Sequence, residues 1–229
     1  VKLSGGGFWM YRGVGARLEW ALLNFFISEH LKDGYEFILP PLQLGYNCGF
    51  GAGQFPKFSD EVYWLDVDED RKKNRFMLPT AETALVNIYS GEIIDESKLP
   101  MKMFAYTPCF RKEAGSYRSE ERGMIRGHQF NKVEMVKITK PEQSYEELES
   151  MTRQAEKVLQ LLGLPQEDFA QPKPMAALRT IMETDSSDYV DYCFLYSEEY
   201  QLYVYCTLRA NTDENSIYLS SWMGVCSFT

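Results

Sequence analysis

The sequence lacks the features that would indicate a membrane, secreted or zinc-binding protein. No stretch reaches the roughly 18 consecutive apolar residues that a membrane-spanning helix requires, and residues 1–13 lack the apolar centre of a signal peptide. The missing apolar run leads us to expect no membrane span. Only His30 and His128 offer imidazole ligands, and no CxxC pair occurs, so we identify no protein ligand for a metal. The cysteines are odd in number and widely spaced, which predicts reduced thiols and a cytoplasmic protein: Cys48, Cys109, Cys193, Cys206 and Cys226.

Positive charge is also scarce, because the formal net charge of the 229 residues is −9. Such a balance argues against a surface that binds nucleic acid over its whole extent. Residues 111–126 are the local exception, with basic residues outnumbering acidic ones. Five are basic and three are acidic, namely Arg111, Lys112, Arg118, Arg122 and Arg126 against Glu113, Glu120 and Glu121. This charge is enough for a small polyphosphate ligand, and it is modest for a nucleic-acid site.

The apolar content of 45% is ample for a core, and the pattern predicts an α+β fold with an antiparallel sheet flanked by helices. Amphipathic periodicity predicts helices over residues 15–31 and 141–162, with Gly34 ending the first. Ser144 and Glu147 have the spacing of a capping box for the second. Runs rich in β-branched and aromatic residues predict strands at 8–11, 35–39, 63–67, 75–78, 103–106, 129–136, 202–207 and 217–222.

The hairpin predicted between residues 103 and 137 carries unusually many charges. Arginines fixed on rigid strands suit a polyphosphate, and neighbouring carboxylates suit an ammonium group or phosphate-bound Mg²⁺. A solvated hairpin with surface ion pairs explains the composition about as well. In the strand at 129–136, Phe130, Val133 and Met135 alternate with polar neighbours, which predicts that these three share the buried face.

Three segments of the chain resemble a known enzyme family. FRKE at 110–113, followed by a loop and RGHQFNKVE at 126–134, resembles the second signature motif of class II aminoacyl-tRNA synthetases, and of seryl-tRNA synthetases in particular. Residues 15–42 resemble the first motif, and LPTAE at 78–82 resembles the serine-binding loop. The resemblance covers roughly residues 2–165. It implies a catalytic core over residues 1–165, with a divergent part at 166–229 that completes the same domain.

The resemblance also implies roles for the hairpin residues. Arg111 is expected to be the catalytic residue, clamping the α-phosphate of ATP and the substrate carboxylate. Glu113, Arg126 and Phe130 complete the expected ATP site, in which adenine stacks on Phe130 and Mg²⁺ accompanies ATP. His128 and Cys109 are expected to pack or form hydrogen bonds and to take no part in catalysis.

Serine is expected to bind between Thr80, Glu82, Arg111 and Glu134, again by resemblance. Lys132 is a supporting residue that pairs with one of these glutamates. Without the resemblance, Thr80 and Glu82 are explained equally well by a helix start, with Thr80 as the cap and Glu82 in the first turn. The family further implies a homodimer formed through residues 15–42, and tRNA(Ser) bound by a helical arm that this sequence does not contain.

The C-terminal part departs from the family. The strands at 202–207 and 217–222 place Tyr203 and Leu219 where acidic residues are expected, and no arginine stretch resembles the third motif. We therefore expect this polypeptide alone to activate serine weakly and to charge tRNA worse still. Three interpretations stay open: a serine-activating enzyme or a fragment of one, a paralogue that loads a carrier protein or serves as a non-catalytic binding or regulatory module, and a misassigned or frameshifted tail.

Overall fold

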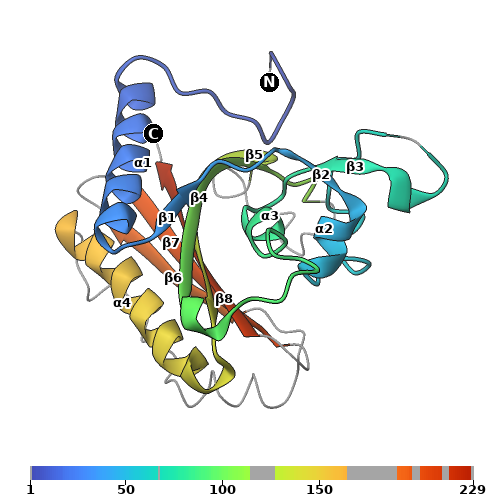
Figure 1. The fold of residues 1–229 in the computed structure, drawn as a ribbon. Helices are drawn as coiled ribbons and strands as arrows, with labels where there is room; N and C mark the ends of the chain where they lie inside the picture. The colour runs from blue at the N-terminus through green and yellow to red at the C-terminus, as the bar shows by residue number, and fades with distance from the viewer. Residues whose placement is uncertain are drawn as a thin grey trace.

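A computed structural model describes residues 2–66, 68–113, 127–163, 190–197, 202–212 and 217–227. A six-stranded sheet in the order β1-β4-β5-β8-β7-β6 is flanked by helices, with a separate two-stranded sheet of β2 and β3 (Figure 1). The strands are β1 Glu36–Ile38, β2 Gln43–Gly45, β3 Arg75–Met77, β4 Met101–Phe110, β5 Gln129–Thr139, β6 Val190–Ser197, β7 Leu202–Thr212 and β8 Ile217–Ser227. The α-helices are α1 Val14–Lys32, α2 Tyr46–Gly51, α3 Glu82–Leu85 and α4 Ser144–Leu161, and single 3-10 turns span Arg71–Lys73, Glu96–Lys98 and Pro141–Gln143.

The large sheet is antiparallel except at one edge, where β1 runs parallel to β4. β4 and β5 form a long hairpin ladder, from Met101 opposite Ile138 to Phe110 opposite Gln129. The predicted α+β class with an antiparallel sheet is therefore confirmed. The hairpin occupies the second and third places among the six strands. Its two faces are covered by different helices.

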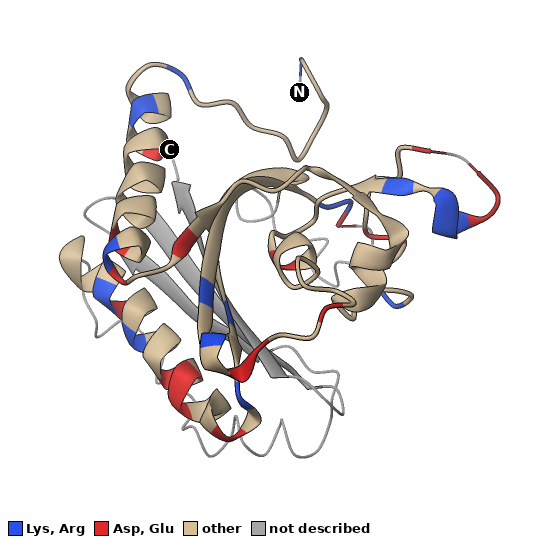
Figure 2. Ribbon diagram, in the orientation of Figure 1, with Lys and Arg blue, Asp and Glu red and all other residues tan. Residues whose placement is uncertain are grey.

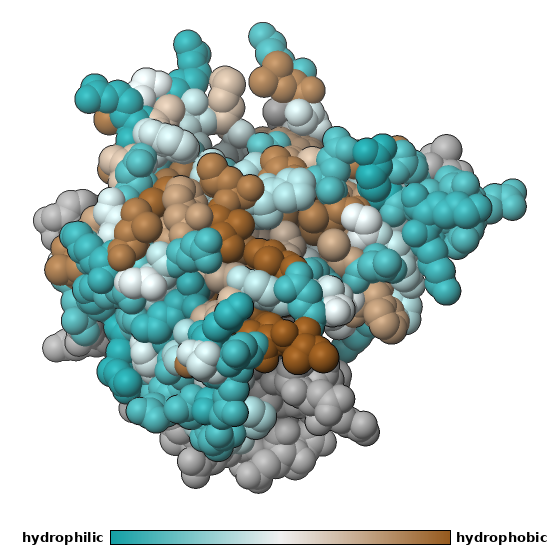
Figure 3. Space-filling model, in the orientation of Figure 1, coloured by the Kyte–Doolittle hydropathy of each residue, from teal (hydrophilic) through white to brown (hydrophobic). Residues whose placement is uncertain are grey.

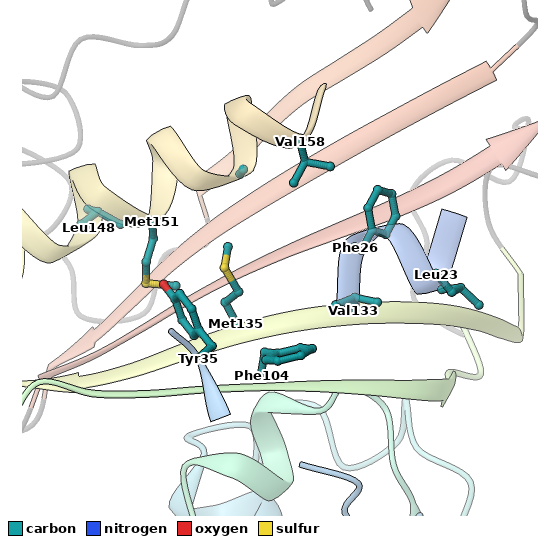
Figure 4. Close-up of a cluster of buried hydrophobic side chains, with 10 residues drawn as sticks. Leu23, Phe26, Tyr35, Phe104, Val133, Met135, Leu148, Met151 and Val158 are labelled. Atoms are coloured by element: carbon teal, nitrogen blue, oxygen red, sulfur yellow. The ribbon is translucent and has the colours of Figure 1, made fainter. Parts of the chain in front are cut away.

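One face of the hairpin packs against α1 and α4. Phe104 from β4, with Val133 and Met135 from β5, meets Phe26 of α1 and Met151 of α4 in the main core cluster (Figure 4). All five side chains are essentially inaccessible to solvent. Burying a side chain of this size stabilises a fold by about 1.5–3 kcal/mol. This cluster therefore holds both long helices against the hairpin.

The opposite face packs against α3 and the small sheet. Met103 and Ala105 of β4 and Val136 of β5 contact Ala81 and Leu85. Alternation along each strand sends successive side chains to opposite faces. Lys132 and Glu134 consequently lie on the α3 side, between residues that belong to the main core. Phe130 packs on this side as well, against the cluster that contains Leu44, Phe55 and Cys109, so the prediction that it shares a face with Val133 and Met135 was wrong.

Several element boundaries differ from the sequence predictions. β4 continues through Pro108 to Phe110, where a stop at residue 106 was predicted, and residues 8–11 form no strand. Residues 63–66 contribute a single bridge, from Trp64 to Phe76. Neither α2, at residues 46–51, nor β6 was predicted. The predicted helix at 15–31 and the glycine that ends it are confirmed, with Gly34 at a φ of 80°.

The predicted capping box at the start of α4 is wrong. Ser144 lies inside the first turn, where the preceding residue makes no side-chain capping bond. Glu147 instead accepts a 2.6 Å hydrogen bond from the buried Nζ of Lys137 on β5. The tertiary ion pair therefore takes the carboxylate that the local pattern assigned to the helix start.

Surface chemistry differs between regions of the molecule. Charged residues lie along α4 and on the projecting segment that precedes β3 (Figure 2). Apolar residues form a band across the middle of the same view, over α1 and β1 (Figure 3). Large apolar side chains that are exposed on α1 and just after β1 are Val14, Leu18, Trp20, Leu31 and Leu39. None of the helices in the described ranges combines the length and the apolar character needed to cross a bilayer.

Candidate active site

Three of the predicted site residues form one buried polar cluster on the α3 side of the hairpin. The carboxylate of Glu134 accepts hydrogen bonds from Thr80 Oγ1, at 2.7 Å to Oε2 and 3.0 Å to Oε1. Lys132 Nζ lies 3.0 Å from the same Oε2 and donates to Thr80 Oγ1 at 2.6 Å. The Thr80 hydroxyl therefore accepts a hydrogen bond from the ammonium group and donates one to the carboxylate.

The burial of this cluster separates it from an ordinary surface ion pair. The side chains of Lys132 and Glu134 are both 0% exposed, although they come from a strand rich in charges. Charges are rarely buried unless they are paired and hydrogen-bonded. The interpretation of the hairpin as a solvated surface element is thus wrong for these two residues. The prediction that Lys132 pairs with a glutamate of the cluster is confirmed.

The start of α3 joins the same cluster through its backbone. The amide N–H of Glu82 donates to Glu134 Oε2 at 2.9 Å. The residue before α3 is Ala81, and no side chain caps the helix, so the explanation of Thr80 as a helix cap is wrong. Glu134 Oε2 therefore receives a hydroxyl, an ammonium and an amide donor at once. The Glu82 side chain is also buried, at 4% exposure of the residue.

Arg111 lies at the end of β4, next to Phe130. Its Nε donates to the carbonyl oxygen of Pro79 at 3.1 Å, which ties the guanidinium to the residue before Thr80. The guanidinium carbon is 5.4 Å from the centre of the Phe130 ring, within the range of a cation–π contact. The structure thus brings an arginine, an aromatic face and the buried cluster together across neighbouring strands.

Two predicted site residues, Glu113 and Arg126, remain. Glu113 follows β4 with a φ of 51°, a left-handed conformation that is uncommon for a non-glycine residue. Arg126 lies outside the described residues. Sequence reasoning did not find the carbonyl of Pro79 or the amide of Glu82, because backbone groups carry no residue signature. Proline and threonine in LPTAE were the available signal for a fixed turn beside the site.

Cys109 was expected to be a small buried hydrophobe, and its surroundings agree. The residue is 0% exposed and packs in the cluster with Leu44 and Phe76. Burial raises the pKa of its thiol, and the nearby ammonium of Lys132 only partly opposes this. A raised pKa keeps the sulfur protonated and unreactive at neutral pH.

Within the part of the chain that the structure describes, no three histidine, cysteine or acidic residues gather into a group that could hold a metal ion. Carboxylates near the site are engaged by cations and amide groups, as Glu134 illustrates. The described residues therefore do not make a dedicated cage for Mg²⁺.

Comparison with known proteins agrees with this geometry. Residues 63–217 match the family described as tRNA synthetase class II core domain (G, H, P, S and T). Serine–tRNA ligase 2 of Clostridium acetobutylicum is 63% identical over 164 residues, which are 72% of this chain and 39% of that protein. Serine–tRNA ligase of Syntrophomonas wolfei is 51% identical over 166 residues, 72% of this chain and 38% of that protein. The chain thus spans about two fifths of the length of these relatives.

Solved structures show the same fold. Seryl-tRNA synthetase from Pyrococcus horikoshii, complexed with ATP, is 23% identical with a TM-score of 0.69, over 97% of this chain and 51% of that one. Cytoplasmic serine–tRNA ligase from Naegleria fowleri, in complex with AMP, is 22% identical with a TM-score of 0.73, over 96% of this chain and 54% of that one. The family match covers well over half of the sequence and includes the buried cluster and the Arg111–Phe130 pair. The chain belongs to the class II tRNA synthetase core family.

Proposed function

We propose that this chain activates serine with ATP, forming seryl-adenylate and pyrophosphate, and that the activated serine is passed to tRNA(Ser). The observation that carries the proposal is the connection between the buried polar cluster and the Arg111–Phe130 pair. The Thr80–Lys132–Glu134 cluster is linked to Arg111 and Phe130 through Pro79, whose carbonyl accepts the Arg111 bond. Relatives that share more than half of their aligned residues with it are named serine–tRNA ligases.

In this reaction a carboxylate oxygen of serine attacks the α-phosphorus of ATP, and the bond to the β-phosphate oxygen breaks. Two anions must approach each other, so a fixed cation that contacts both lowers the barrier. We assign this role to Arg111, whose Nε–H···O=C bond to Pro79 holds the guanidinium in place. The remaining guanidinium nitrogens form a planar fork that suits phosphate and carboxylate oxygens. Arg111 therefore acts as an electrostatic clamp and transfers no proton.

The adenine end of ATP is assigned to the neighbouring residues. Phe130 is half-buried and presents an aromatic ring beside Arg111, so adenine stacks on it in the proposed complex. Glu113 and Arg126 complete the nucleotide site in this proposal, with Arg126 on the outer phosphates. Mg²⁺ that accompanies ATP is held largely by phosphate oxygens and water. We assign it no protein ligand and route no step through it.

Recognition of serine is assigned to Thr80, Glu82 and Glu134. Acceptors of this kind hold an ammonium group and a hydroxyl, and the acceptor of the serine hydroxyl loses that bond when alanine enters. An unpaired buried polar group costs about 1–3 kcal/mol, which discriminates against alanine by about 5- to 150-fold. Lys132 is a supporting residue in this scheme, because it neutralises Glu134 and fixes Thr80.

We further propose that residues 1–165 form the catalytic core and that residues 166–229 complete the same domain. The pairing of β8 with β5, from Val133 opposite Met223 to Thr139 opposite Ile217, supports a single domain that includes the C-terminal part. Leu219, which stands where an acidic residue was expected, pairs with Lys137 in that register. The proposal places the protein in the cytoplasm, a reducing compartment that suits the free thiols of Cys48 and Cys109.

The proposal includes a homodimer formed through residues 15–42. Exposed apolar side chains on α1 and after β1 support it: Leu18 is 53% exposed, Trp20 56% and Leu39 70%. Exposed apolar side chains of this size are common in protein interfaces. β1 also lies at the edge of the large sheet, where its outer backbone groups are open to a partner.

The proposed function is tested by exchange of labelled pyrophosphate into ATP. We expect exchange that requires serine and that alanine or glycine does not support. Replacement of Arg111 by alanine should abolish it while the circular dichroism spectrum is unchanged. Serine-independent exchange, or exchange by Arg111→Ala within about tenfold of the parent chain, a difference of about 1.4 kcal/mol, would show that Arg111 is not the clamp.

A further inference from the structure

The backbone of Arg111 is held at both of its peptide groups by a single residue. Its N–H donates to the carbonyl oxygen of His128 at 3.0 Å. Its own carbonyl oxygen lies 3.1 Å from Nδ1 of the His128 ring. A carbonyl can only accept, so Nδ1 carries the proton of this bond.

This arrangement replaces a missing rung of the β4–β5 ladder. Phe110 pairs with Gln129, so Arg111 and His128 are the next opposed pair. In a regular antiparallel ladder the His128 N–H would return a bond to the carbonyl of Arg111. It donates instead to Gly7 at 2.9 Å. The imidazole therefore supplies the bond that the backbone has given to the N-terminal segment.

The N-terminal segment is fitted closely to this position. Gly7 has a φ of +74°, and a Cβ there would lie 2.4 Å from Cδ2 of His128. The Phe8 ring packs against the imidazole at a tilt of 41°, with 5.2 Å between the ring centres. A Cβ on Gly127 would lie 2.0 Å from the Trp9 ring. These contacts leave no room for side chains at either glycine, so the segment is seated directly against the backbone beside Arg111.

We propose that residues 7–9 and His128 form a positioning brace that sets the location of the Arg111 guanidinium. This inference rests on the proposed function, in which Arg111 is the clamp. The brace fixes the backbone at Arg111, and the Nε bond to Pro79 fixes the other end of its side chain. A clamp on a transition state tolerates little displacement, since misplacement by about 1 Å can lower a rate by about 100-fold. His128 touches neither substrate in this scheme and is a positioning residue.

The test compares two substitutions of His128 that separate the hydrogen bond from the ring. His128→Phe keeps an aromatic ring against Phe8 but removes the donor to Arg111. His128→Asn removes the ring but keeps an N–H donor near the Nδ1 position. In serine-dependent pyrophosphate exchange, His128→Phe should lower kcat by about 10- to 100-fold with the KM for ATP changed by less than about threefold. His128→Asn should recover most of the loss.

A second pair of variants tests the N-terminal half of the brace. Gly7→Ala places a methyl group against His128 and should reproduce the fall in kcat. Gly6→Ala is the matched control, because nothing lies within 4 Å of its Cβ position, and it should leave kcat unchanged. Equal activity of Gly7→Ala and Gly6→Ala, or equal loss in His128→Phe and His128→Asn, would overturn the proposal.

Amide hydrogen exchange provides a readout that needs no turnover. In His128→Phe, exchange at the Arg111 amide should quicken by about tenfold or more, while the Phe104 amide in the middle of β4 keeps its protection. Unchanged protection at Arg111 would contradict the brace even if the parent chain showed no exchange activity. If the parent chain showed no pyrophosphate exchange but its amides showed the expected protection pattern, the proposed function would be contradicted and the brace would be supported.

Discussion

Replacing Lys132 by methionine tests the buried cluster at its centre. The substitution keeps an unbranched chain of similar length and removes the ammonium group that contacts Thr80 Oγ1 and Glu134 Oε2. Glu134 retains the hydroxyl of Thr80 and the amide of Glu82 as donors, but its negative charge stays buried without a cation. Breaking a buried pair in this way destabilises a protein by about 3–5 kcal/mol. That loss is a large part of the 5–15 kcal/mol that ordinarily holds a domain folded.

The double variant Lys132→Met/Glu134→Gln separates charge from packing. It removes both charges, and the glutamine side chain still accepts hydrogen bonds from Thr80 and the Glu82 amide. We expect the double variant to be more stable than Lys132→Met alone by about 1–3 kcal/mol. Urea unfolding followed by tryptophan fluorescence measures these differences. Lys72→Met, at an exposed position, is the control and should stay within about 0.5 kcal/mol of the parent.

Two results would refute this reasoning. The first is a Lys132→Met variant whose free energy of unfolding lies within about 1 kcal/mol of the parent, because a buried carboxylate without a cation should destabilise the fold by more than that. The second is a double variant less stable than Lys132→Met, because it would show that the glutamate is not the source of the penalty.

Three further predictions follow from other parts of the molecule. Thr80→Val should destabilise the fold by about 1–3 kcal/mol and reduce the preference for serine over alanine in pyrophosphate exchange, whereas Thr80→Ser should do neither; equal discrimination in both variants would contradict the assignment. Leu18→Ser/Trp20→Ser should shift the mass from light scattering toward the monomer, with the fully exposed Ile93→Ser as control; a parent that is already monomeric at micromolar concentration would exclude the dimer. Burial lowers the pKa of His30 from 6.5 to about 4, so the unfolded chain binds a proton at this residue before the folded chain does. The contribution of His30 to the free energy of unfolding should therefore be full above pH 6.5 and fall by about 3 kcal/mol as the pH drops to 4. His30→Leu should flatten this part of the urea-unfolding profile, and an unchanged slope would rule His30 out as its source.

Much of the fold was predictable because its elements have strong periodic signals. The apolar stripes of α1 and α4 and the motif at 110–134 predicted two helices on an antiparallel hairpin, which the structure confirms. Strand ends were less predictable. Pro108 appeared to end β4, but its register partner is Asn131, and the ladder continues two residues further. A proline interrupts a strand only where its missing N–H is needed by a neighbour.

The residues of the site and the Lys132–Glu134 pair were predictable, but the burial of that pair was not. Lys132, Glu134 and Thr80 were named from their motifs, yet a charged strand residue looks the same in sequence whether it is buried or solvated. Burial was decided by α3 packing onto the even-numbered face of β5, a long-range arrangement that no local pattern contains. Ser144 and Glu147 show the opposite failure: their spacing predicted a local capping box, but Glu147 pairs with Lys137 in the tertiary structure. The bonds that join Gly7 to His128, and His128 to the backbone of Arg111, involve mostly backbone atoms, which leave little signal in one sequence.

Serine-dependent exchange of labelled pyrophosphate into ATP, measured for the 229-residue chain beside its Arg111→Ala variant, tests the central claim most directly. The account predicts exchange that appears only when serine is present and that disappears in Arg111→Ala. A folded parent chain that shows no serine-dependent exchange, or an Arg111→Ala variant that matches it, would contradict the account.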